Sequence, residues 1–400
     1  TVRLLRAADG TPEFEVVGAA GATARYPVSH SYGAGHGRFK QRYMTRIDGT
    51  LRVSPLQYNE ATGEWVAYHL ERWIDAAGAL QQPSATQTFE TGCQGCHSTG
   101  LQLEPGEDDV VRAAYTELNT GCEACHGPAS KHVLAPRGDN IINPRRLYPA
   151  GTFGIIGMDG QVAQAEAWAG FQRAQEACGK CHVRGHSKTA AGAAGAFEFP
   201  WVEARGAHGQ VQVGEPLADG FVPGDGLWDD TRYDRTASSK QHHQQYTDEL
   251  NGHLTGAGHG RNPFHLVACF DCHDPHGGPL DSQLRLPAND NTLCLDCHGP
   301  HGFEDQAAII GHTGHARHNP ETTGSGRCVG CHMPRTAKSA VNYDIRSHSF
   351  RVVVPHESTA QVAEGAPVMP NSCDVCHVDD ADRGANRYEI FFDAPERVED

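Results

Sequence analysis

The residues of this sequence that could carry chemistry form one pattern, which occurs seven times. Two cysteines stand three positions apart and a histidine follows the second cysteine directly, as in "TGCQGCHSTG" at residues 91–100. The copies are Cys93/Cys96/His97, Cys122/Cys125/His126, Cys178/Cys181/His182, Cys269/Cys272/His273, Cys294/Cys297/His298, Cys328/Cys331/His332 and Cys373/Cys376/His377. They use all 14 cysteines of the chain. Thiols and imidazoles at this spacing bind zinc, form disulfides or attach haem, and one interpretation must account for every copy.

Two alternatives to haem do not explain seven copies. A zinc ribbon combines two C-x-x-C halves into a four-thiolate site, which gives the following histidine no role and leaves one half without a partner. A thioredoxin-like redox motif occurs once, beside a βαβ pattern. Covalent attachment of haem c explains every feature, because two thiols bind the vinyl groups of one porphyrin and the adjacent imidazole becomes the proximal ligand of its iron. The sequence therefore predicts seven covalent haems.

The composition indicates a chain that is short of core-forming side chains. Only 38% of the residues are hydrophobic, and 46 glycines and 23 prolines favour turns over regular structure. Seven porphyrins, which are large, flat and apolar, would supply the missing buried surface. We therefore expect a mostly irregular, haem-packed fold with short α-helices and a small β-rich N-terminal region. We also expect folding to require haem.

The charge and hydropathy of the chain limit its partners and its compartment. The formal net charge is −16, and seven bis-histidine ferric haems at about −1 each would make it roughly −23. This excludes nucleic acid as a partner, whereas a solvated acidic surface and a docking patch for basic proteins both remain open. No apolar run approaches the ~18 residues of a membrane span. Because haem is attached to these motifs outside the cytoplasm, we expect an extracellular or periplasmic protein whose signal segment lies outside this numbering.

The sequence divides into three regions. Residues 1–90 lack cysteine and show strand patterns, among them a hairpin signal at Asp48-Gly49 between two alternating runs. Residues 91–235 carry the first three motifs, and residues 236–400 carry the other four and an acidic tail. Between the third and fourth motifs, "SSKQHHQQYTDELNGH" predicts a polar helix, and "YEIFF" near the C-terminus predicts a strand.

The second axial ligand of each iron sets its reduction potential. A methionine opposite the proximal histidine raises the potential, and a second imidazole leaves it low. The chain has four methionines, whereas eighteen of its 25 histidines lie outside the motifs, so we expect bis-histidine ligation at all or nearly all haems. Met333 directly follows His332, and the chain there cannot readily reach the opposite face of the same iron.

Eight histidines are candidates for the seven distal positions because of their place near the motifs, the helix candidate or the β-rich region. They are His36, His132, His243, His259, His276, His315, His318 and His348. Four others are expected at the surface, namely His69, His208, His301 and His356. The remaining six are left unassigned: His30, His186, His242, His253, His265 and His312.

Several longer stretches resemble a known family. These are "HSYGAGHGRFKQRYMTRIDGTLRVSPLQYNEATGEW", "GCEACHGPASKH", "HHQQYTDEL", "CFDCHDPHG" and "CVGCHMPRTAKSAVNYDIRSHSF". They resemble the large secreted multihaem cytochromes c related to cytochrome c554, and they are also similar to multihaem cytochromes that polymerise into extracellular filaments. The resemblance covers most of residues 25–377. It implies a haem-packed fold and electron transfer with redox partner proteins or a terminal acceptor.

Two functions compete on the sequence. Six-coordinate haems pass electrons but have no open iron position for a substrate, which favours a carrier over an enzyme. The alternative is a periplasmic oxidoreductase of the nitrite reductase or hydroxylamine oxidoreductase kind, which needs one five-coordinate iron. The pentahaem nitrite reductases, which this chain distantly resembles, often mark that haem with lysine, whereas all seven motifs here end in histidine. No cluster of Arg, Tyr and His stands out in the sequence, and redox-silent haems kept for packing alone would not explain seven irons.

The haem density also suggests assembly. One haem per roughly 57 residues would let electrons hop through the whole subunit. The β-rich region, the "YEIFF" segment and the surplus of histidines suggest a head-to-tail interface that repeats into an open filament, in which one distal histidine could come from the next subunit. The alternative is a monomeric periplasmic shuttle whose acidic surface keeps copies apart.

Overall fold

The structure is a computed structural model that describes part of the chain. The described residues are 1–33, 39–106, 110–147, 161–189, 196–224, 228, 238–252, 267–314, 326–340, 343–355 and 369–373. They form two compact units, each built from two stretches of chain: unit 1 contains Thr1–Pro144 and Arg184–Asp225, and unit 2 contains Arg145–Val183 and Gly226–Asp400. This division follows contacts in space, whereas the division into three regions followed the positions of the motifs and stays a prediction.

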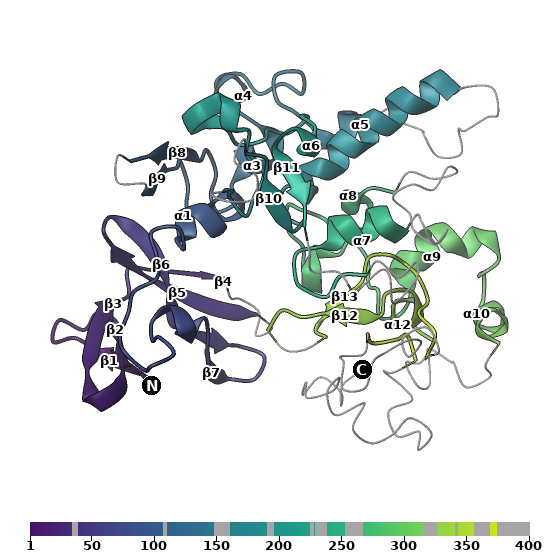
Figure 1. Cartoon of the computed structure of the whole chain (residues 1–400). Coiled ribbons are helices and arrows are strands. Elements are labelled where there is room, and N and C mark those ends of the chain that lie inside the picture. Colours follow the sequence, from purple (N-terminus) through teal and green to yellow (C-terminus); the bar gives the residue numbers. More distant parts are fainter. Residues whose placement is uncertain are drawn as a thin grey trace, which may run out of the picture. The chain divides into compact units, whose positions relative to one another are not determined.

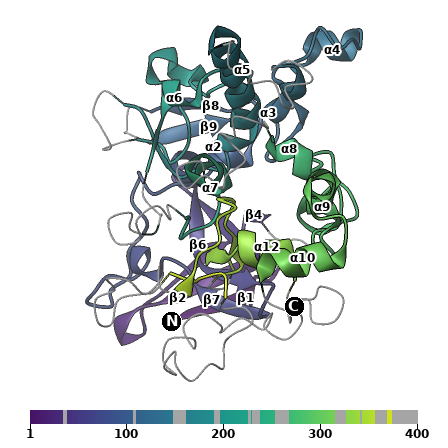
Figure 2. The ribbon, with the colours of Figure 1, turned by 90° about the vertical axis from the view of Figure 1, so that its right-hand side faces the viewer.

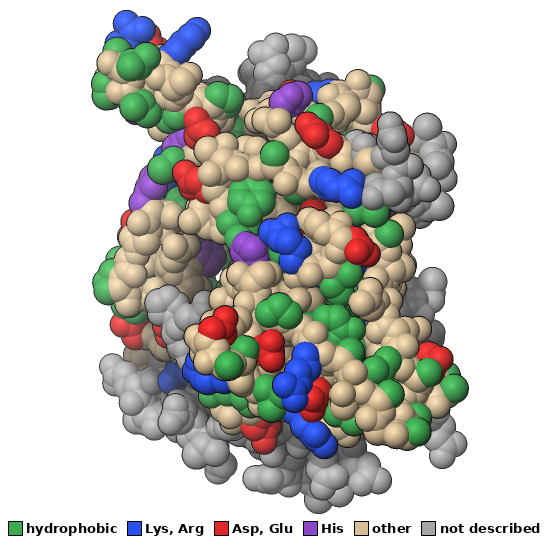
Figure 3. Space-filling view, turned by 90° about the vertical axis from the view of Figure 1, so that its left-hand side faces the viewer, with side chains coloured by type: hydrophobic (Ala, Val, Ile, Leu, Met, Phe, Trp, Pro, Cys, Tyr) green, Lys and Arg blue, Asp and Glu red, His purple; other side chains and the backbone are tan. Residues whose placement is uncertain are grey.

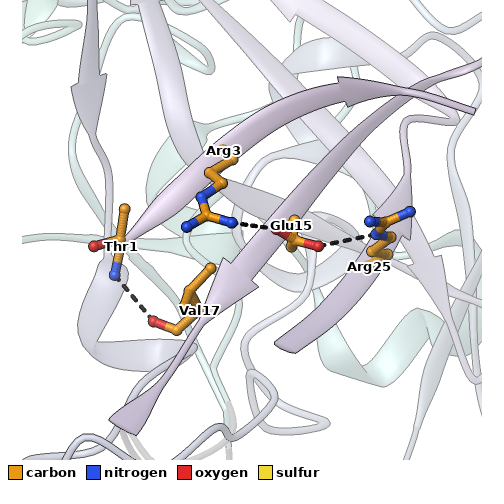
Figure 4. A network of polar contacts seen from close by, with 5 residues as sticks. All are labelled: Thr1, Arg3, Glu15, Val17 and Arg25. Carbon is orange, nitrogen blue, oxygen red and sulfur yellow. Dashed lines mark hydrogen bonds and ion pairs between the residues drawn. The ribbon is translucent and has the colours of Figure 1, made fainter. Parts of the chain in front are cut away.

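Unit 1 begins with a three-stranded antiparallel sheet in the order β1-β2-β3 (Figure 1). Its strands are β1 (Val2–Arg6), β2 (Pro12–Val17) and β3 (Thr23–Pro27). Arg3 and Arg25 on the outer strands both pair with Glu15 on the central strand, at 3.2 and 3.0 Å, and the N-terminal amino group donates to the Val17 carbonyl oxygen (Figure 4). The inner face packs Phe14, Val16 and Trp73 into a small core.

A second antiparallel sheet follows in the order β4-β5-β6-β7. Its strands are β4 (His30–Gly33), β5 (Lys40–Ile47), β6 (Thr50–Asn59) and β7 (Glu64–Ala67). Asp48 and Gly49 connect β5 to β6 with φ angles of 50° and 81°, the left-handed conformation that a two-residue hairpin of this kind requires. The predicted β-rich N-terminal region and its hairpin are therefore confirmed.

The rest of unit 1 consists of short elements. They are η1 (Ala19–Gly21), η2 (Leu70–Arg72), α1 (Phe89–Gly92), α2 (Gln94–His97), β8 (Gln102–Pro105), β9 (Val111–Ala114), α3 (Cys122–His126), α4 (Ser130–Leu134), η3 (Pro144–Arg146, which ends in unit 2), β10 (Gly185–Ser187), η4 (Glu203–His208), α6 (Leu217–Gly220) and β11 (Phe221–Pro223). Strands β8 and β9 pair with each other, as do β10 and β11. Leu101, Leu103, Phe199 and Trp201 form a core beside α2.

Unit 2 is mainly helical, and Figure 2 shows its motif-bearing helices following one another along the unit. Its elements are α5 (Gln161–Gly179), α7 (Gln245–Gly252), α8 (Cys269–Cys272), η6 (Asp281–Gln283), α9 (Thr292–His298), η7 (Gly299–His301), α10 (Gln306–Thr313), α12 (Cys328–His332), β12 (Arg335–Ala337) and β13 (Ile345–Arg346). The expectation of short helices missed α5, which is 19 residues long. Its run of alanine and glutamine has high helix propensity and could have predicted it. The polar helix candidate forms α7 over its second half.

The described residues contain several small hydrophobic clusters rather than one large core. Those of unit 2 are built around Phe171 with Phe270 and around Trp228 with Val353. Within this part of the chain, every helix is too short or too polar to span a bilayer. On the face drawn in Figure 3, acidic and basic side chains are interspersed among hydrophobic ones. The small clusters and short elements agree with the expected fold class.

Candidate haem-binding sites

Each described motif occupies one helical turn or lies at the end of a helix. In the first, third and fourth motifs the histidine backbone N–H donates to the carbonyl oxygen of the first cysteine, at 3.2, 3.0 and 2.9 Å. This bond closes a turn in which residues three and four apart share a face, so both thiols and the imidazole lie on the same side. The turn is the geometry that attachment of one porphyrin through two thioethers and one proximal ligand needs. Of the seventh motif, Cys376 and His377 lie outside the described residues.

The predicted attachment cysteines differ in how far they are buried. Cys122 and Cys297 are exposed, whereas the other described motif cysteines are half-buried: Cys93, Cys96, Cys125, Cys178, Cys181, Cys269, Cys272, Cys294, Cys328, Cys331 and Cys373. None of these side chains is fully enclosed by the polypeptide, although we expect haem to cover all of them. Attachment at each thiol therefore fits the accessibility of its residue and stays a prediction.

Three second cysteines of motifs, Cys125, Cys181 and Cys331, are placed by their backbones. Cys125 lies within α3, directly before His126. The Cys181 backbone N–H donates to the Cys178 carbonyl oxygen at 3.1 Å, which closes the turn just beyond α5. The Cys331 carbonyl oxygen accepts the Ser372 hydroxyl at 2.7 Å, so the sixth motif contacts the residue that precedes Cys373 of the seventh.

The first motif lies beside a half-buried cluster of aromatic and cationic groups. The Tyr32 ring is 5.1 Å from the His97 ring, edge to face, and the Arg42 guanidinium donates to the Tyr32 hydroxyl at 3.3 Å. Arg42 also lies 4.0 Å over the Tyr68 ring. The β5–β6 register shifts just after Arg42, a bulge of the kind that re-aims a side chain. Burial raises the pKa of the Cys93 thiol to about 11.

This cluster corrects one expectation. The sequence showed no site-like group of Arg, Tyr and His, because Tyr32, Arg42 and His97 come from three separate segments. The structure brings them together at the first motif, and within the described residues Arg42 forms no ion pair with a carboxylate. In the sequence, the only sign of this cluster was the tyrosines beside the predicted strands.

The second motif carries anchored histidines on α3 and α4. His126 Nδ1 lies 2.7 Å from the Ile142 carbonyl oxygen. His132 Nδ1 lies 3.0 Å from both the Arg137 carbonyl oxygen and Asn140 Oδ1. In haem proteins the nitrogen that does not bind metal typically makes such a bond, which fixes the tautomer and the ring.

The third and fourth motifs interact through their first cysteines. The interaction between the Cys178 and Cys269 thiols lowers the pKa of Cys178 and raises that of Cys269. Gln175, one turn before Cys178, accepts the Cys269 backbone N–H at 2.7 Å. A buried carboxylate, Glu249, lies 3.9 Å from the Cys269 sulfur, and burial raises its pKa to about 8.

The fifth and sixth motifs are joined in the same way. The interaction between the Cys294 and Cys328 thiols lowers the pKa of Cys328 to about 7. Asn291, one turn before Cys294, accepts the Cys328 backbone N–H at 2.8 Å. In unit 2 the third motif is therefore linked to the fourth, and the fifth to the sixth.

Two pairs of imidazoles face each other across motifs of unit 2. The His273 and His348 rings have centres 6.3 Å apart at 25°, and the His312 and His332 rings have centres 6.0 Å apart at 18°. An iron bound by two imidazole nitrogens at about 2 Å, each about 1.1 Å from its ring centre, separates the centres by about 6 Å when the three are in line. The residues present therefore fit a haem iron held between two histidines.

The hydrogen bonds and the lowered pKa values of these histidines also suit iron binding. Nδ1 of His273, His348 and His332 lies 2.8, 3.1 and 3.2 Å from the carbonyl oxygens of Ser282, Arg346 and Phe350, which directs Nε2 away from the backbone. Burial lowers the pKa of His348 to about 4, helped by the charge of His273. Burial also lowers the pKa of His97 and of His182. Neutral imidazole is the form that binds a metal.

Two further predicted ligands have other neighbours. His276 is 77% exposed and lies 3.7 Å from Asp274. His243 has a φ of 52° and meets the His242 ring edge to face at 4.4 Å. Four candidates lie outside the described residues: His36, His259, His315 and His318. His312, whose ring faces that of His332, was left unassigned in the sequence, where two histidines between them were chosen as candidates instead.

The comparisons with known proteins agree with the motifs. The family model "Cytochrome c554 and c-prime" matches residues 63–127, and the model "Doubled CXXCH motif" matches residues 262–303. The "Crystal Structure of Outer Cell Wall Cytochrome OcwA" is 22% identical, with a TM-score of 0.54 over 86% of this chain and 71% of that one. The "Undecaheme cytochrome from S-layer of Carboxydothermus ferrireducens" is 18% identical, with a TM-score of 0.40 over 90% of this chain and 52% of that one. No curated protein matches the chain.

These comparisons bear on the family and the fold. The two family models cover separate parts of the chain, and each contains C-x-x-C-H copies found here. The likeness to the outer cell wall cytochrome extends the agreement in fold across both units. The resemblance to secreted multihaem cytochromes c related to cytochrome c554 is therefore confirmed, and the chain is a multihaem c-type cytochrome.

Proposed function

We propose that this chain binds seven haems c and carries electrons along them, mostly between pairs of histidine ligands. The observation that carries this proposal is the contact between successive motifs in unit 2. Gln175, beside the third motif, binds the backbone of Cys269 in the fourth, and Asn291, beside the fifth motif, binds the backbone of Cys328 in the sixth. Haems attached to motifs linked in this way are neighbours, so electrons can pass between them within the protein.

The imidazole pairs support a ligand assignment. His348 is the distal ligand of the haem at the fourth motif, opposite His273, and His312 is that of the haem at the sixth, opposite His332. The other distal ligands come from the predicted set, with His132 favoured by its two Nδ1 bonds. The proximal ligands are the seven motif histidines.

Each bound haem supplies reversible one-electron exchange between ferric and ferrous iron. The protein holds the imidazoles by Nδ1 bonds and keeps them neutral by burial. With two imidazoles per iron, potentials are low, and like charges on adjacent haems spread them into coupled steps. The protein is therefore an electron carrier, because a six-coordinate iron has no open position for a substrate.

The partners are redox proteins or a terminal acceptor, in an extracellular or periplasmic location. Both similar structures are named for the cell wall or S-layer, which favours the extracellular side. Assembly into a head-to-tail filament is supported by the resemblance and by β1, an edge strand in its sheet that carries Leu4 at 43% exposure. A monomeric shuttle is the alternative, and negative-stain microscopy of native protein distinguishes fibres from discrete particles.

A second function is considered at the first motif, where Tyr32 and Arg42 lie beside His97, the proposed proximal ligand of its haem. An oxidoreductase of the nitrite or hydroxylamine class needs such acid/base groups near an open iron position. Adding nitrite or hydroxylamine to the ferric protein tests it. A high-spin ferric EPR signal that shifts on addition supports an enzyme, whereas an unchanged low-spin spectrum supports the carrier.

Mass spectrometry of the intact protein tests the main proposal. We expect the mass of the chain plus seven haems, with all 14 cysteines resistant to alkylation. Bound zinc or free thiols would overturn it. Potentiometric titration should give a broad, low range, and a single sharp step at high potential would contradict bis-histidine ligation.

A further inference from the structure

Helix α7 (Gln245–Gly252) contacts the binding residues of two neighbouring motifs. At its first residue, Gln245 Oε1 lies 3.1 Å from His182 Nδ1 of the third motif. At its end, a Cβ on Gly252 would lie 2.4 Å from the Ser349 carbonyl oxygen, so only glycine allows this approach. The helix therefore packs directly on the segment that carries His348.

Asp248, in the middle of α7, is fully buried and wholly occupied by hydrogen bonds. Its Oδ1 accepts the Ser239 N–H at 2.6 Å, and its Oδ2 accepts the Ser239 hydroxyl at 2.8 Å and the His348 backbone N–H at 3.0 Å. The neighbours of His348, Ser347 and Ser349, are also fully buried and share a hydroxyl bond of 3.0 Å. A buried carboxylate is costly unless every oxygen is satisfied, so this arrangement fixes the backbone at His348 closely.

The position of the His348 ring depends on that backbone. Its Nδ1 bonds to the Arg346 carbonyl oxygen within the same short segment, so ring and backbone move as one piece. The ring stands 6.3 Å from His273, centre to centre. A backbone shift of about 1 Å would take Nε2 out of reach of an iron bound to His273.

We infer that Asp248 is the positioning residue that holds His348 as a distal haem ligand, with Gln245 on the same helix orienting His182 of the neighbouring haem. This inference rests on the proposed function, in which His348 ligates the haem of the fourth motif. Helix α7 then couples the ligation of two adjacent haems. Loss of partners of this kind costs roughly 10–100-fold in metal affinity.

The test uses the full-length, haem-loaded protein with Asp248→Ala. We expect all covalent haems to remain, because the cysteines are untouched, while one haem changes from low-spin to high-spin in EPR and near-infrared spectra. Added imidazole should restore the low-spin signal. Asp248→Asn, which keeps one acceptor oxygen, should give a smaller high-spin fraction, and Gln245→Ala should shift one potential upward without a spin change. Asp219→Asn, an exposed carboxylate on α6, is the control and leaves the spectra unchanged.

His348→Ala separates this inference from the function beneath it. If His348→Ala gives one high-spin haem and both Asp248 variants remain low-spin, Asp248 does not position the ligand and the inference is overturned. If His348→Ala itself leaves every haem low-spin, the ligand assignment is wrong. Should Asp248→Ala fail to accumulate, the Asp248→Asn spectrum decides, and a wholly low-spin spectrum overturns the inference.

Discussion

The two units surround their motifs with different kinds of side chain. In unit 1 the first motif faces a half-buried guanidinium, Arg42, and the rings of Tyr32 and Tyr68. In unit 2 the third and fourth motifs face two buried acidic side chains, Asp248 and Glu249, which are 0% and 7% exposed. A nearby cation favours the reduced haem, because reduction removes a positive charge from the iron, whereas an acidic side chain favours the oxidised haem only when it is ionised.

The units also differ in how their motifs are connected. In unit 2, an amide one turn before a motif binds the backbone of the next: Gln175 holds Cys269 and Asn291 holds Cys328. The same device occurs twice, so the two motif pairs are built alike. Unit 1 uses sheet strands to line its first motif instead. Under the proposed function, unit 2 serves electron passage between haems and the surroundings of the first motif set the potential of one haem.

Interrupting the series in unit 2 should have the largest effect. Replacing Cys294 and Cys297 by alanine removes the haem between the fourth and sixth motifs, and electron re-equilibration within unit 2 should be lost. Replacing Cys93 and Cys96 removes one haem of unit 1 as the control and should leave that process intact. Transient absorption after a photochemical reductant pulse measures both, and equal rates in the two variants would refute a continuous series.

Removing a distal imidazole should have the next largest effect. His312→Ala should convert one haem to the high-spin form and raise its potential, because the ring opposite His332 is lost. His301→Ala, on the exposed η7 turn, is the control. EPR at low temperature measures the spin state, and a fully low-spin His312→Ala protein would show that another residue holds that position.

Arg42→Gln should lower the potential of one haem without changing its ligands. Loss of this half-buried charge should shift the reduction potential downward by roughly 60 mV, which corresponds to a tenfold change in the equilibrium constant for one electron. Arg205→Gln removes a surface charge that pairs with Glu215 and should shift nothing measurable. Spectroelectrochemistry compares the two. If the potential shifts in both variants, or in neither, the proposed electrostatic difference between the two units is contradicted.

The smallest effect concerns pH. Burial raises the pKa of Glu249 from its ordinary 4.5 to about 8, so the folded state holds its proton more tightly than the unfolded state. The resulting stability is complete below about pH 4.5 and is lost as the pH rises towards 8, by at most a few kcal/mol. Glu249→Gln should flatten this decline. Denaturant unfolding at pH 5, 7 and 9 measures the free energy of unfolding of both proteins. If it falls with pH in parallel for the two, the raised pKa of Glu249 is contradicted.

Much of the fold was predictable where it depends on local chemistry. The hairpin at Asp48-Gly49 follows from residues that tolerate positive φ. Helix α7 appeared in the sequence as a polar helix, but its start at Gln245 did not, because His243 takes a positive φ that ends regular structure there. Helix α5 was not predicted, although its alanine-rich run has high helix propensity.

The candidate site was predictable only in its covalent part. His348 was selected by its position after a motif and faces His273, whereas His312 was passed over and faces His332. His276 was selected by the same reasoning and is exposed. Short distance along the chain is thus a weak guide to a distal ligand, because the opposite face of a haem is covered by whatever segment the tertiary fold brings there.

The sequence by itself determined the attachment chemistry, because two thiols and one imidazole within a single helical turn need no distant residue to bind one porphyrin. Only the tertiary structure decided which motifs touch, which imidazoles face each other, and which charges surround them. Those features depend on contacts between segments far apart in sequence, such as Tyr32 with His97 and Asp248 with His348. Packing and burial, which no local pattern encodes, select them.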